Sequence, residues 1–478
     1  MSERRRQAQD PRSLRYDAPL LDAYLTFCAA HARPFTIPGH KGRSDLVGSV
    51  VAGDVPYYAG LDTMKVERGV LATAQSRAAA LWGADLARFS TGGSTHGNQA
   101  LALALASPGD EVVVQRTVHR SVFLGLVLAG LDPVWVSPQV DAGTGVPLGV
   151  PAEVVRAALA AHPSARAVLL GDPSYVGTTG DVAGAAAAAH AAGVPLVVDA
   201  AWAAHFGFHP GLPAHAIALG ADAMVTSAHK MLPAYSQAAL VLTRGPRIDR
   251  ARLDAAVEAT ATTSPAGAIL ASIDAARALL ARDGAQLLGR LLPLVAEARE
   301  RLGAVPGVRV LHGPRVDPAK LVVLLAGSGA DGVAVERDLI AAGMPVELAD
   351  RDLLIAIVTM ADTAATVSEL VERLVSSIEH HRGAPRPTVP AAVWSVAPEQ
   401  VVSPREAFFA PKVALTIRDA VGRVSGELVA PYPPGVPVLA PGERVTGESV
   451  DALLTAREAG TRIAYAADPT LATLLVLG

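Results

Sequence analysis

The sequence predicts an α/β fold with a mainly parallel central sheet, a second and smaller α/β domain, and a C-terminal α+β domain. Two observations carry this prediction. Apolar runs of strand length alternate with Ala-rich helical stretches over roughly the first half of the chain. A long helical stretch then leads to new strands, and a Pro-rich stretch precedes the last segment, as expected for a linker.

The strands of the large domain are expected in apolar runs that Gly or Pro punctuate. These runs are ADLARFS, DEVVVQR, PVWVS, RAVLLGD, VPLVVDA, DAMVTS and AALVLT. Because helical stretches separate most of them, the strands should be connected by crossovers and lie mainly parallel, covered on both faces. VRVLHG, KLVVLLAG and the helix AATVSELVERLVSSIEHH indicate a second unit with its own sheet.

The predicted domain boundaries follow these changes of pattern. We expect an N-terminal segment over 1–33, a large domain over 34–265, a small α/β domain over 266–381, a linker over 382–400 and a C-terminal domain over 401–478. A long helix, AILASIDAARALLARDGAQLLGRLLPLVAEARERLG, connects the large domain to the small one.

The composition argues against several classes of binding partner. The formal net charge of -4 gives no reason to expect nucleic acid or an anionic membrane surface. The chain is 51% hydrophobic, yet no run of about 18 apolar residues is free of charge, Pro and Gly, so no membrane span is predicted. Cys28 is the single cysteine and no signal peptide is recognised, which indicates a cytoplasmic protein. The small net charge instead favours a small molecule or a second copy of the chain as the binding partner.

The stretch TSAHKMLPAYSQAAL places Lys230 in a short turn between two buried strands. Lysine is rare in this chain, which uses arginine for nearly all its positive charge. The other lysines are Lys41, Lys65, Lys320 and Lys412. A lysine retained at a strand end suggests that its amine performs covalent chemistry.

The stretch STGGSTHGNQALALALA follows one strand and opens a helix. Its glycines permit tight turns, Ser94 and Thr95 supply hydroxyl groups, and a helix N-terminus presents free N–H groups to an anion. The stretch is therefore a candidate phosphate cup, with an ordinary capped loop as the alternative.

Other polar residues stand at strand ends. Asp199 closes VPLVVDA at the carboxyl edge of the sheet, where open α/β sheets bind ligands, although a helix N-cap is the plainer interpretation. His119 lies between a strand and a helix, and Ser227 and His229 directly precede Lys230.

Pyridoxal phosphate would use all of these groups together. It needs an anion cup, a flat group against its ring, a carboxylate at its pyridine nitrogen and a lysine amine for its aldehyde. The carboxylate keeps the ring nitrogen protonated and makes the ring an electron sink. Asp199 and Lys230 are 31 residues apart, which leaves room for a loop, a helix and one more parallel strand.

The sequence resembles the bacterial Orn/Lys/Arg decarboxylases, which depend on pyridoxal phosphate and have the aspartate aminotransferase fold (fold type I). The resemblance rests on PFTIPGHKG, GGSTHGNQA, RTVHRS, DPSYVGTTGD, VDAAWAAHFGFHP, TSAHKMLPAYSQAAL, SPREAFFA and PYPPGVPVLAPGE, so it extends over nearly the whole chain. It implies a short form without the N-terminal response-regulator-like domain of larger members. It also implies a homodimer or dimer of dimers whose active sites are shared between subunits.

The resemblance also implies residue roles. Lys230 holds the cofactor, Asp199 binds the pyridine nitrogen and His119 stacks on the ring. The phosphate is held by Ser94, Thr95, Ser227 and His229. No metal site is expected.

By the same resemblance the substrate is a basic amino acid, converted to CO2 and a polyamine-type amine. Its distal cation needs an acidic partner, and the candidates in the C-terminal segment are Glu406, Glu427 and Glu443. Ala266 and Gly267 stand where the family pattern has bulkier residues. These smaller residues are expected to lengthen the substrate pocket, which favours lysine or arginine over ornithine. The alternatives are another reaction of the same cofactor, such as transamination or aldol cleavage, and a non-catalytic relative that binds the cofactor.

Overall fold

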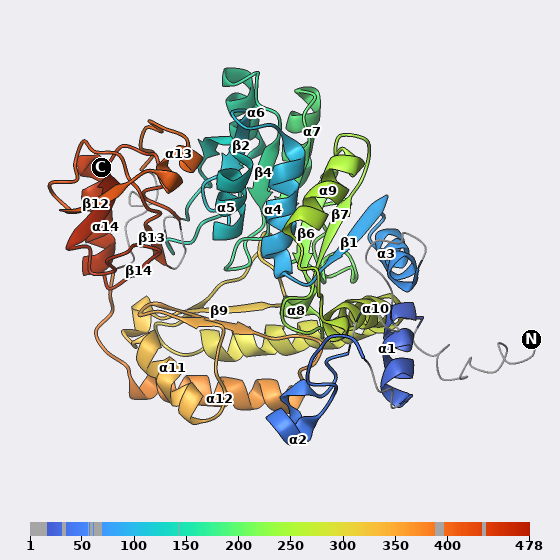
Figure 1. Cartoon of the computed structure of the whole chain (residues 1–478). Coiled ribbons are helices and arrows are strands. Elements are labelled where there is room, and N and C mark those ends of the chain that lie inside the picture. The colour runs from blue at the N-terminus through green and yellow to red at the C-terminus, as the bar shows by residue number, and fades with distance from the viewer. Residues whose placement is uncertain are drawn as a thin grey trace, which may run out of the picture.

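The computed structural model describes residues 17–30, 35–55, 57, 61, 69–141, 143–387, 396–432 and 436–478. Pro34, Lys65, most of the predicted N-terminal segment, residues 388–395 of the predicted linker and residues 433–435 of PYPPGVPVLAPGE lie outside these ranges. Figure 1 shows three bodies of structure, with the long helix α10 (Gly267–Gly303) running beneath the first.

The first body is built on a seven-stranded sheet. In spatial order its strands are β1 (Leu86–Ser90), β7 (Ala239–Thr243), β6 (Ala223–Ser227), β5 (Leu196–Asp199), β4 (Val168–Gly171), β2 (Glu111–Gln115) and β3 (Asp132–Val136). Strand β7 runs antiparallel to both of its neighbours, and the remaining pairs are parallel. Each strand coincides with a predicted run, except that β3 begins one residue before PVWVS, and the mainly parallel sheet is confirmed.

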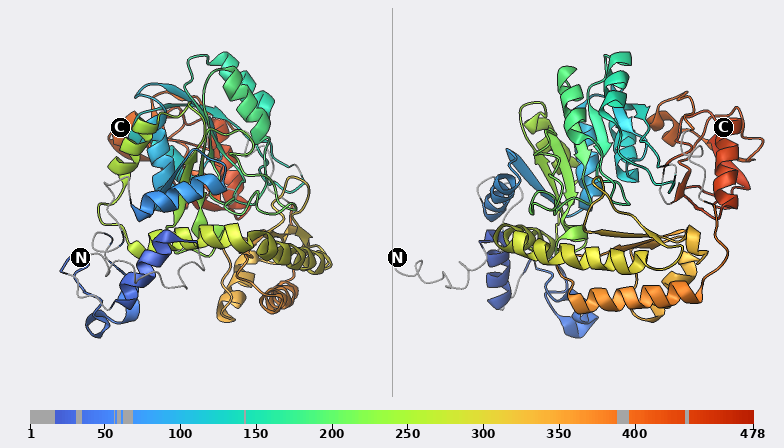
Figure 2. Two further views of the ribbon diagram at one scale, coloured as in Figure 1. Left: turned by 90° about the vertical axis from the view of Figure 1, so that its right-hand side faces the viewer. Right: turned by 180° about the vertical axis from the view of Figure 1, so that it is seen from behind.

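Helices cover both faces of this sheet, as Figures 1 and 2 show. One face packs on α4 (Gly93–Leu105), α5 (Arg120–Ala129) and α9 (Arg250–Thr260). The other packs on α3 (Val70–Leu81), α6 (Ala152–Ala161), α7 (Val182–Ala191) and α10. Within β5, Val197 joins the first core and Val198 the second, because successive strand residues point to opposite faces.

The second body is a four-stranded antiparallel sheet. Its order is β10 (Leu348–Ala349), β11 (Leu353–Ile357), β9 (Lys320–Leu324) and β8 (Arg309–Val310), and it packs against α10, α11 (Gly332–Ala341) and α12 (Ala364–His380). Shorter elements are α1 (Pro19–Ala29), α2 (Ser44–Val47), η2 (Ser49–Val51), α8 (Ala228–Met231) and η3 (Ala326–Ser328). The exact boundaries between the domains stay a prediction.

The C-terminal body comprises α13 (Pro404–Phe409), β12 (Lys412–Thr416), β13 (Ala430–Tyr432), α14 (Gly447–Glu458), β14 (Arg462–Ala464) and β15 (Thr473–Leu477). Strands β12 and β15 form one antiparallel pair, and β13 and β14 form another. This body lies beside α5 in Figure 1, and a buried ion pair between Arg116 and Glu443 joins it to the end of β2. No helix in the described part of the chain is both long and apolar enough to cross a membrane.

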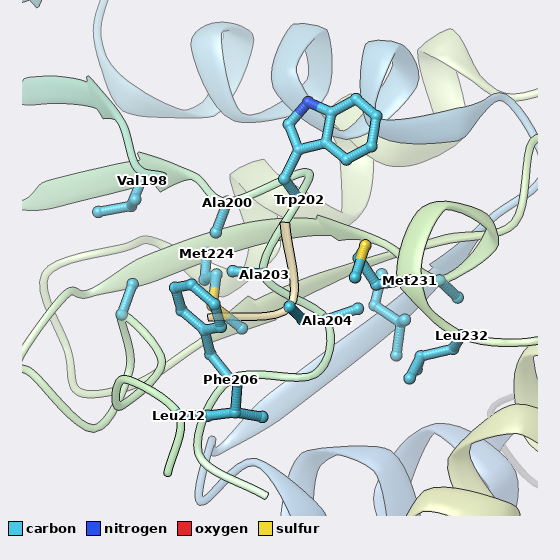
Figure 3. Close-up of a cluster of buried hydrophobic side chains, with 14 of the residues drawn as sticks. Val198, Ala200, Trp202, Ala203, Ala204, Phe206, Leu212, Met224, Met231 and Leu232 are labelled. Atoms are coloured by element: carbon cyan, nitrogen blue, oxygen red, sulfur yellow. The ribbon is translucent and has the colours of Figure 1, made fainter. Parts of the chain in front are cut away.

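The turn after β5 is packed as tightly as a core strand. Figure 3 shows Ala200, Ala203 and Phe206 clustered with Met224 and other apolar side chains, and the indole of Trp202, which belongs to the same buried core, projecting to the other side of the turn. A buried turn of this kind fixes the backbone that follows Asp199, and with it the direction in which the Trp202 indole projects.

Candidate active site

The loop between β1 and α4 is shaped by backbone contacts. Gly93 has φ +69°, and its N–H donates to the carbonyl of Gln237 at 2.8 Å. A Cβ on Gly92 would lie 2.9 Å from the Cβ of His96, so the glycine is required for this turn. Helix α4 begins at Gly93. The loop thus presents the N-terminus of a 13-residue helix to a cavity.

This cavity has a volume of about 470 Å³ and lies at the carboxyl ends of the sheet strands. Seven of the predicted site residues line it, namely Ser94, Thr95, His119, Asp199, Ser227, His229 and Lys230. The hydroxyl groups of Ser94 and Ser227 are hydrogen-bonded to each other at 2.5 Å although 133 positions separate them. The structure therefore brings together residues that the sequence could place only at separate strand ends.

Asp199 is buried and both of its carboxylate oxygens accept hydrogen bonds. Oδ1 accepts from the backbone N–H of Ala201 at 3.2 Å, and Oδ2 accepts from Asn98 Nδ2 at 2.8 Å. Asn98 Nδ2 also donates to the Ser121 hydroxyl at 2.9 Å, which lies 2.8 Å from His119 Nδ1. A buried hydrogen-bonded chain thus links the carboxylate to the imidazole.

The imidazole of His119 is held in one tautomer by this chain. It forms the N-cap of α5, where Nδ1 accepts the backbone N–H of Ser121 at 3.2 Å. Because Nδ1 is an acceptor, the ring proton belongs on Nε2. His229 is fixed differently, since its Nδ1 donates to the carbonyl of Ala238 at 2.8 Å.

Lys230 lies in α8, a single helical turn after β6. Burial lowers the pKa of its amine, and the carboxylates of Asp199 and Glu347 partly offset this effect. Its Nζ lies 4.1 Å from the centroid of the Trp202 ring. A lowered pKa increases the fraction of the neutral amine, which is the form that attacks a carbonyl carbon.

A second lysine approaches the same indole from the small sheet. Lys320 at the start of β9 is 1% exposed, and its Nζ lies 3.3 Å from the Trp202 ring centroid. This amine has no hydrogen-bond partner among the described residues. Burial lowers its pKa to about 7, Asp317 and Glu347 oppose the change, and Lys230 adds to it.

The far wall of the cavity includes Tyr175 and Tyr465. Tyr175 meets Trp202 edge to face, with ring centroids 5.4 Å apart, and its hydroxyl donates to Glu347 Oε1 at 2.9 Å. Tyr465 comes from the C-terminal body, and its ring centroid lies 5.2 Å from the guanidinium carbon of Arg120.

The three glutamates predicted to bind substrate do not line the cavity in the described chain. Glu406 caps α13 by accepting from Ser403, and Glu427 accepts the backbone N–H groups of Ala467 and Leu475. Glu443 pairs with both terminal nitrogens of Arg116. Their role toward the substrate stays a prediction.

The two small residues predicted to lengthen the pocket lie at the start of α10 and outside the cavity lining. A Cβ on Gly267 would meet Leu61 and Val55 at 2.4 and 2.9 Å. Packing against these two side chains therefore accounts for the glycine. The effect of Ala266 and Gly267 on substrate length also stays a prediction.

Sequence reasoning missed several residues of this site, namely Asn98, Tyr175, Trp202, Lys320, Glu347 and Tyr465. Asn98 carried a usable signal, because it follows Ser94 by four positions in a predicted helix and so shares its face. Tyr175 and Trp202 lie in stretches that carry the family resemblance, and Trp202 follows Asp199 by three positions. Lys320, Glu347 and Tyr465 come from segments far from these in the chain, and nothing in their local sequence indicates that they meet.

Comparison with known proteins identifies the family. Residues 18–329 match Orn/Lys/Arg decarboxylase, major domain, and residues 388–463 match Orn/Lys/Arg decarboxylase, C-terminal domain. The chain belongs to the Orn/Lys/Arg decarboxylase family. It is accordingly a pyridoxal-phosphate-dependent decarboxylase of basic amino acids, as the resemblance implied.

Individual relatives extend over nearly the full chain. It is 30% identical to an arginine decarboxylase of Halalkalibacterium halodurans, with 96% of this chain and 97% of the relative covered. An arginine decarboxylase of Bacillus subtilis is 29% identical, with 97% and 98% covered. The Francisella novicida lysine decarboxylase LdcF superimposes with a TM-score of 0.81 at 20% identity, over 97% of this chain and 81% of that one, and confirms the predicted fold type I.

The residues of the cavity fit the cofactor of this family. The cavity offers hydroxyl groups at a helix N-terminus, an imidazole, a buried carboxylate and a lysine amine of lowered pKa. Pyridoxal phosphate, when bound, supplies the conjugated ring that accepts the electron pair released with CO2. The residues of the cavity lining would supply the contacts that hold it, and the carboxylate of Asp199 would supply the negative charge at its ring nitrogen.

Proposed function

We propose that the chain converts L-arginine to agmatine and CO2. The full-length similarity to two arginine decarboxylases supports arginine over lysine and ornithine. The observation that supports decarboxylation is the cavity whose lining includes both Lys230 and Asp199. In this reaction the bond between Cα and the carboxylate breaks, CO2 leaves, and a proton is added at Cα.

Each residue has a role in this proposal. Lys230 would hold the cofactor covalently through its amine. Asp199, held by Asn98, keeps the pyridine nitrogen protonated. His119 lies against the ring face. The phosphate is held by Ser94, Thr95, Ser227 and His229.

Assembly is part of the same proposal. We expect a homodimer or a dimer of dimers in the cytoplasm, with each active site completed by the neighbouring subunit. Measurement of the molar mass in solution tests this, and an active monomer would contradict it.

The decisive test of the substrate is direct. The purified protein is incubated separately with L-arginine, L-lysine, L-ornithine and the neutral amino acid L-citrulline, and the amines are identified by mass. We expect agmatine with stoichiometric CO2 from arginine. Turnover of lysine or ornithine with no turnover of arginine would refute the proposed substrate.

A further inference from the structure

A second cavity lies where the three bodies of the chain meet, and in the described part of the chain it shares no lining residue with the active-site cavity. Its volume is about 260 Å³. The large body contributes the turn 143–147 and Val176, the C-terminal body contributes Thr461, and the small sheet with its flanking segments supplies the rest. We propose that this cavity binds a small organic cation. The amine product is such a cation, and its choice as the ligand rests on the proposed function.

The carboxylate of Asp350 forms no ion pair in this cavity. Its Oδ1 accepts the backbone N–H groups of Asp352 and Leu353 at 2.8 and 2.6 Å, whereas Oδ2 has no hydrogen-bond or ion-pair partner in the described ranges. Burial raises the pKa of this carboxyl to about 6, so most of it is still ionised at neutral pH. A half-buried charge of this kind costs free energy, which a bound cation would recover.

The other charged groups of the cavity lining already have partners. Asp352 pairs with Arg386 at 2.7 Å, and this guanidinium also donates to backbone carbonyl groups of the same body. Arg309 donates to the carbonyl of Gly143 at 3.0 Å and is exposed to solvent, which screens its charge. The charge that lacks a partner is therefore that of Asp350, and it selects a cation over an anion.

Much of the remaining lining is apolar. Val146, Val176, Leu324 and Leu353 all line the cavity, and they belong to or pack against one apolar cluster. An unpaired carboxylate among apolar side chains suits a ligand that carries a cationic group on a hydrocarbon chain. Agmatine has this form, with a guanidinium group and an ammonium group at the two ends of its chain. Either group would donate a charge-assisted hydrogen bond to Asp350.

Two segments link the second cavity to the active site. In the loop after β4, Tyr175 lines the active-site cavity and the next residue, Val176, lines the second one. In the hairpin of β10 and β11, Asp350 lies in the turn, while Glu347 before β10 accepts the Tyr175 hydroxyl at 2.9 Å. A ligand that displaces the loop or the hairpin would therefore move the wall of the active site, and we expect its binding to alter the turnover of arginine.

The number of bound ligands tests the second cavity. Agmatine is titrated into the holoenzyme by equilibrium dialysis, and we expect the wild type to bind about two molecules per chain, one in each cavity. D350N should lose one of them, because the amide keeps an oxygen for the two backbone N–H groups but removes the charge. T461W should lose the same molecule by filling the cavity from the C-terminal body. E336Q, which removes a charge from α11 of the small body, is the control and should keep both.

The outcomes separate this inference from the proposed function. Two molecules bound in every variant, or one molecule bound in the wild type and retained in D350N, would overturn the inference and leave the proposed function intact. One molecule bound in the wild type and lost in D350N, in a protein that does not decarboxylate arginine, would support the second cavity and contradict the proposed function.

Kinetics test the link between the two cavities. Agmatine that binds only in the active site competes with arginine, so saturating arginine should remove its effect. Agmatine in the second cavity should lower the apparent kcat at saturating arginine by about twofold or more in the wild type, and it should leave the kcat of D350N unchanged. Purely competitive inhibition in both proteins would overturn the link.

Discussion

The two ends of the cavity are built in opposite ways. Around Asp199 each polar group has a partner, in a chain through Asn98 and Ser121 to His119. Around Trp202 two lysine amines lie against one indole, and the amine of Lys320 has no hydrogen-bond partner among the described residues. A network whose polar groups all have partners suits a permanently bound cofactor, whereas charges without partners can respond to a ligand.

The largest effect is expected at Lys230. Lys230→Ala should abolish decarboxylation, because Lys230 is the lysine that α8 brings to the cavity lining in the described part of the chain. Reduction of the wild type with borohydride should attach the cofactor to the peptide that contains SAHK. Lys412→Ala, whose amine donates to the carbonyl of Phe408, is the control. A label on Lys41, Lys65, Lys320 or Lys412 would contradict the assignment.

The next largest effect is expected at Asp199. Asp199→Ala should retain the fold and lose activity by orders of magnitude, because an unprotonated ring nitrogen is a poor electron sink. His119→Ala should lose less, since it removes the group expected against the ring and the end of the hydrogen-bonded chain but leaves the carboxylate of Asp199 in place. Steady-state kinetics with circular dichroism measure both effects. Small and equal losses would mean that the ring is held by other groups.

A smaller effect is expected at Asn98, which orients Asp199. Asn98→Ala should lower kcat by about ten- to a hundredfold, because a charge-assisted hydrogen bond to a buried carboxylate is lost. The cofactor spectrum should also change its dependence on pH, which a purely structural residue would not cause. Gln99→Ala, one position later in α4, serves as the control. An unchanged spectrum with wild-type kcat would remove Asn98 from the network.

The smallest effect concerns stability and Lys320. The ordinary pKa of 10.5 applies to the unfolded chain, whereas burial lowers the folded value to about 7. Between these values the unfolded state binds more protons, so the free energy of unfolding should rise with pH by up to about 1.4 kcal/mol per unit. Below a pH of about 7 the amine is charged in both states, and the full free-energy cost of burying that charge lowers stability. Above the ordinary pKa of 10.5 the amine is neutral in both states and this cost disappears.

Lys320→Met should flatten this pH dependence. Urea unfolding of the wild type and the variant between pH 7 and 10 measures the difference, with Lys412→Met as the control. Parallel pH profiles for the wild type and Lys320→Met would show that the buried amine is paired in the folded protein.

The end of the cavity around Asp199, where the polar groups have hydrogen-bond partners, was largely predictable from sequence. Its residues stand at the ends of strands whose apolar runs are unmistakable, and parallel strands bring their carboxyl ends to one edge. Lys230, Asp199 and His119 therefore meet as predicted. The roles of these residues remain predictions for the experiments above.

The other end was not predictable in this way. Lys320 and Glu347 belong to the small sheet, and they reach Trp202 and Tyr175 only because α10 places that sheet beneath the large one. The sequence offers Glu443 as an acidic partner beside Glu406 and Glu427, because a carboxylate in sequence does not reveal its counter-ion. Only the folded chain shows that Arg116 already occupies it.

The pair between Arg116 and Glu443 makes the C-terminal body hard to exchange between relatives. Arg116 follows β2 of the large sheet and is only 2% exposed, so loss of Glu443 would leave a guanidinium charge in a dry interior. A chimaera that imports a foreign C-terminal body must therefore carry a matching acid at this position. Only parts of the C-terminal body that do not take part in this ion pair can be exchanged without regard to Arg116.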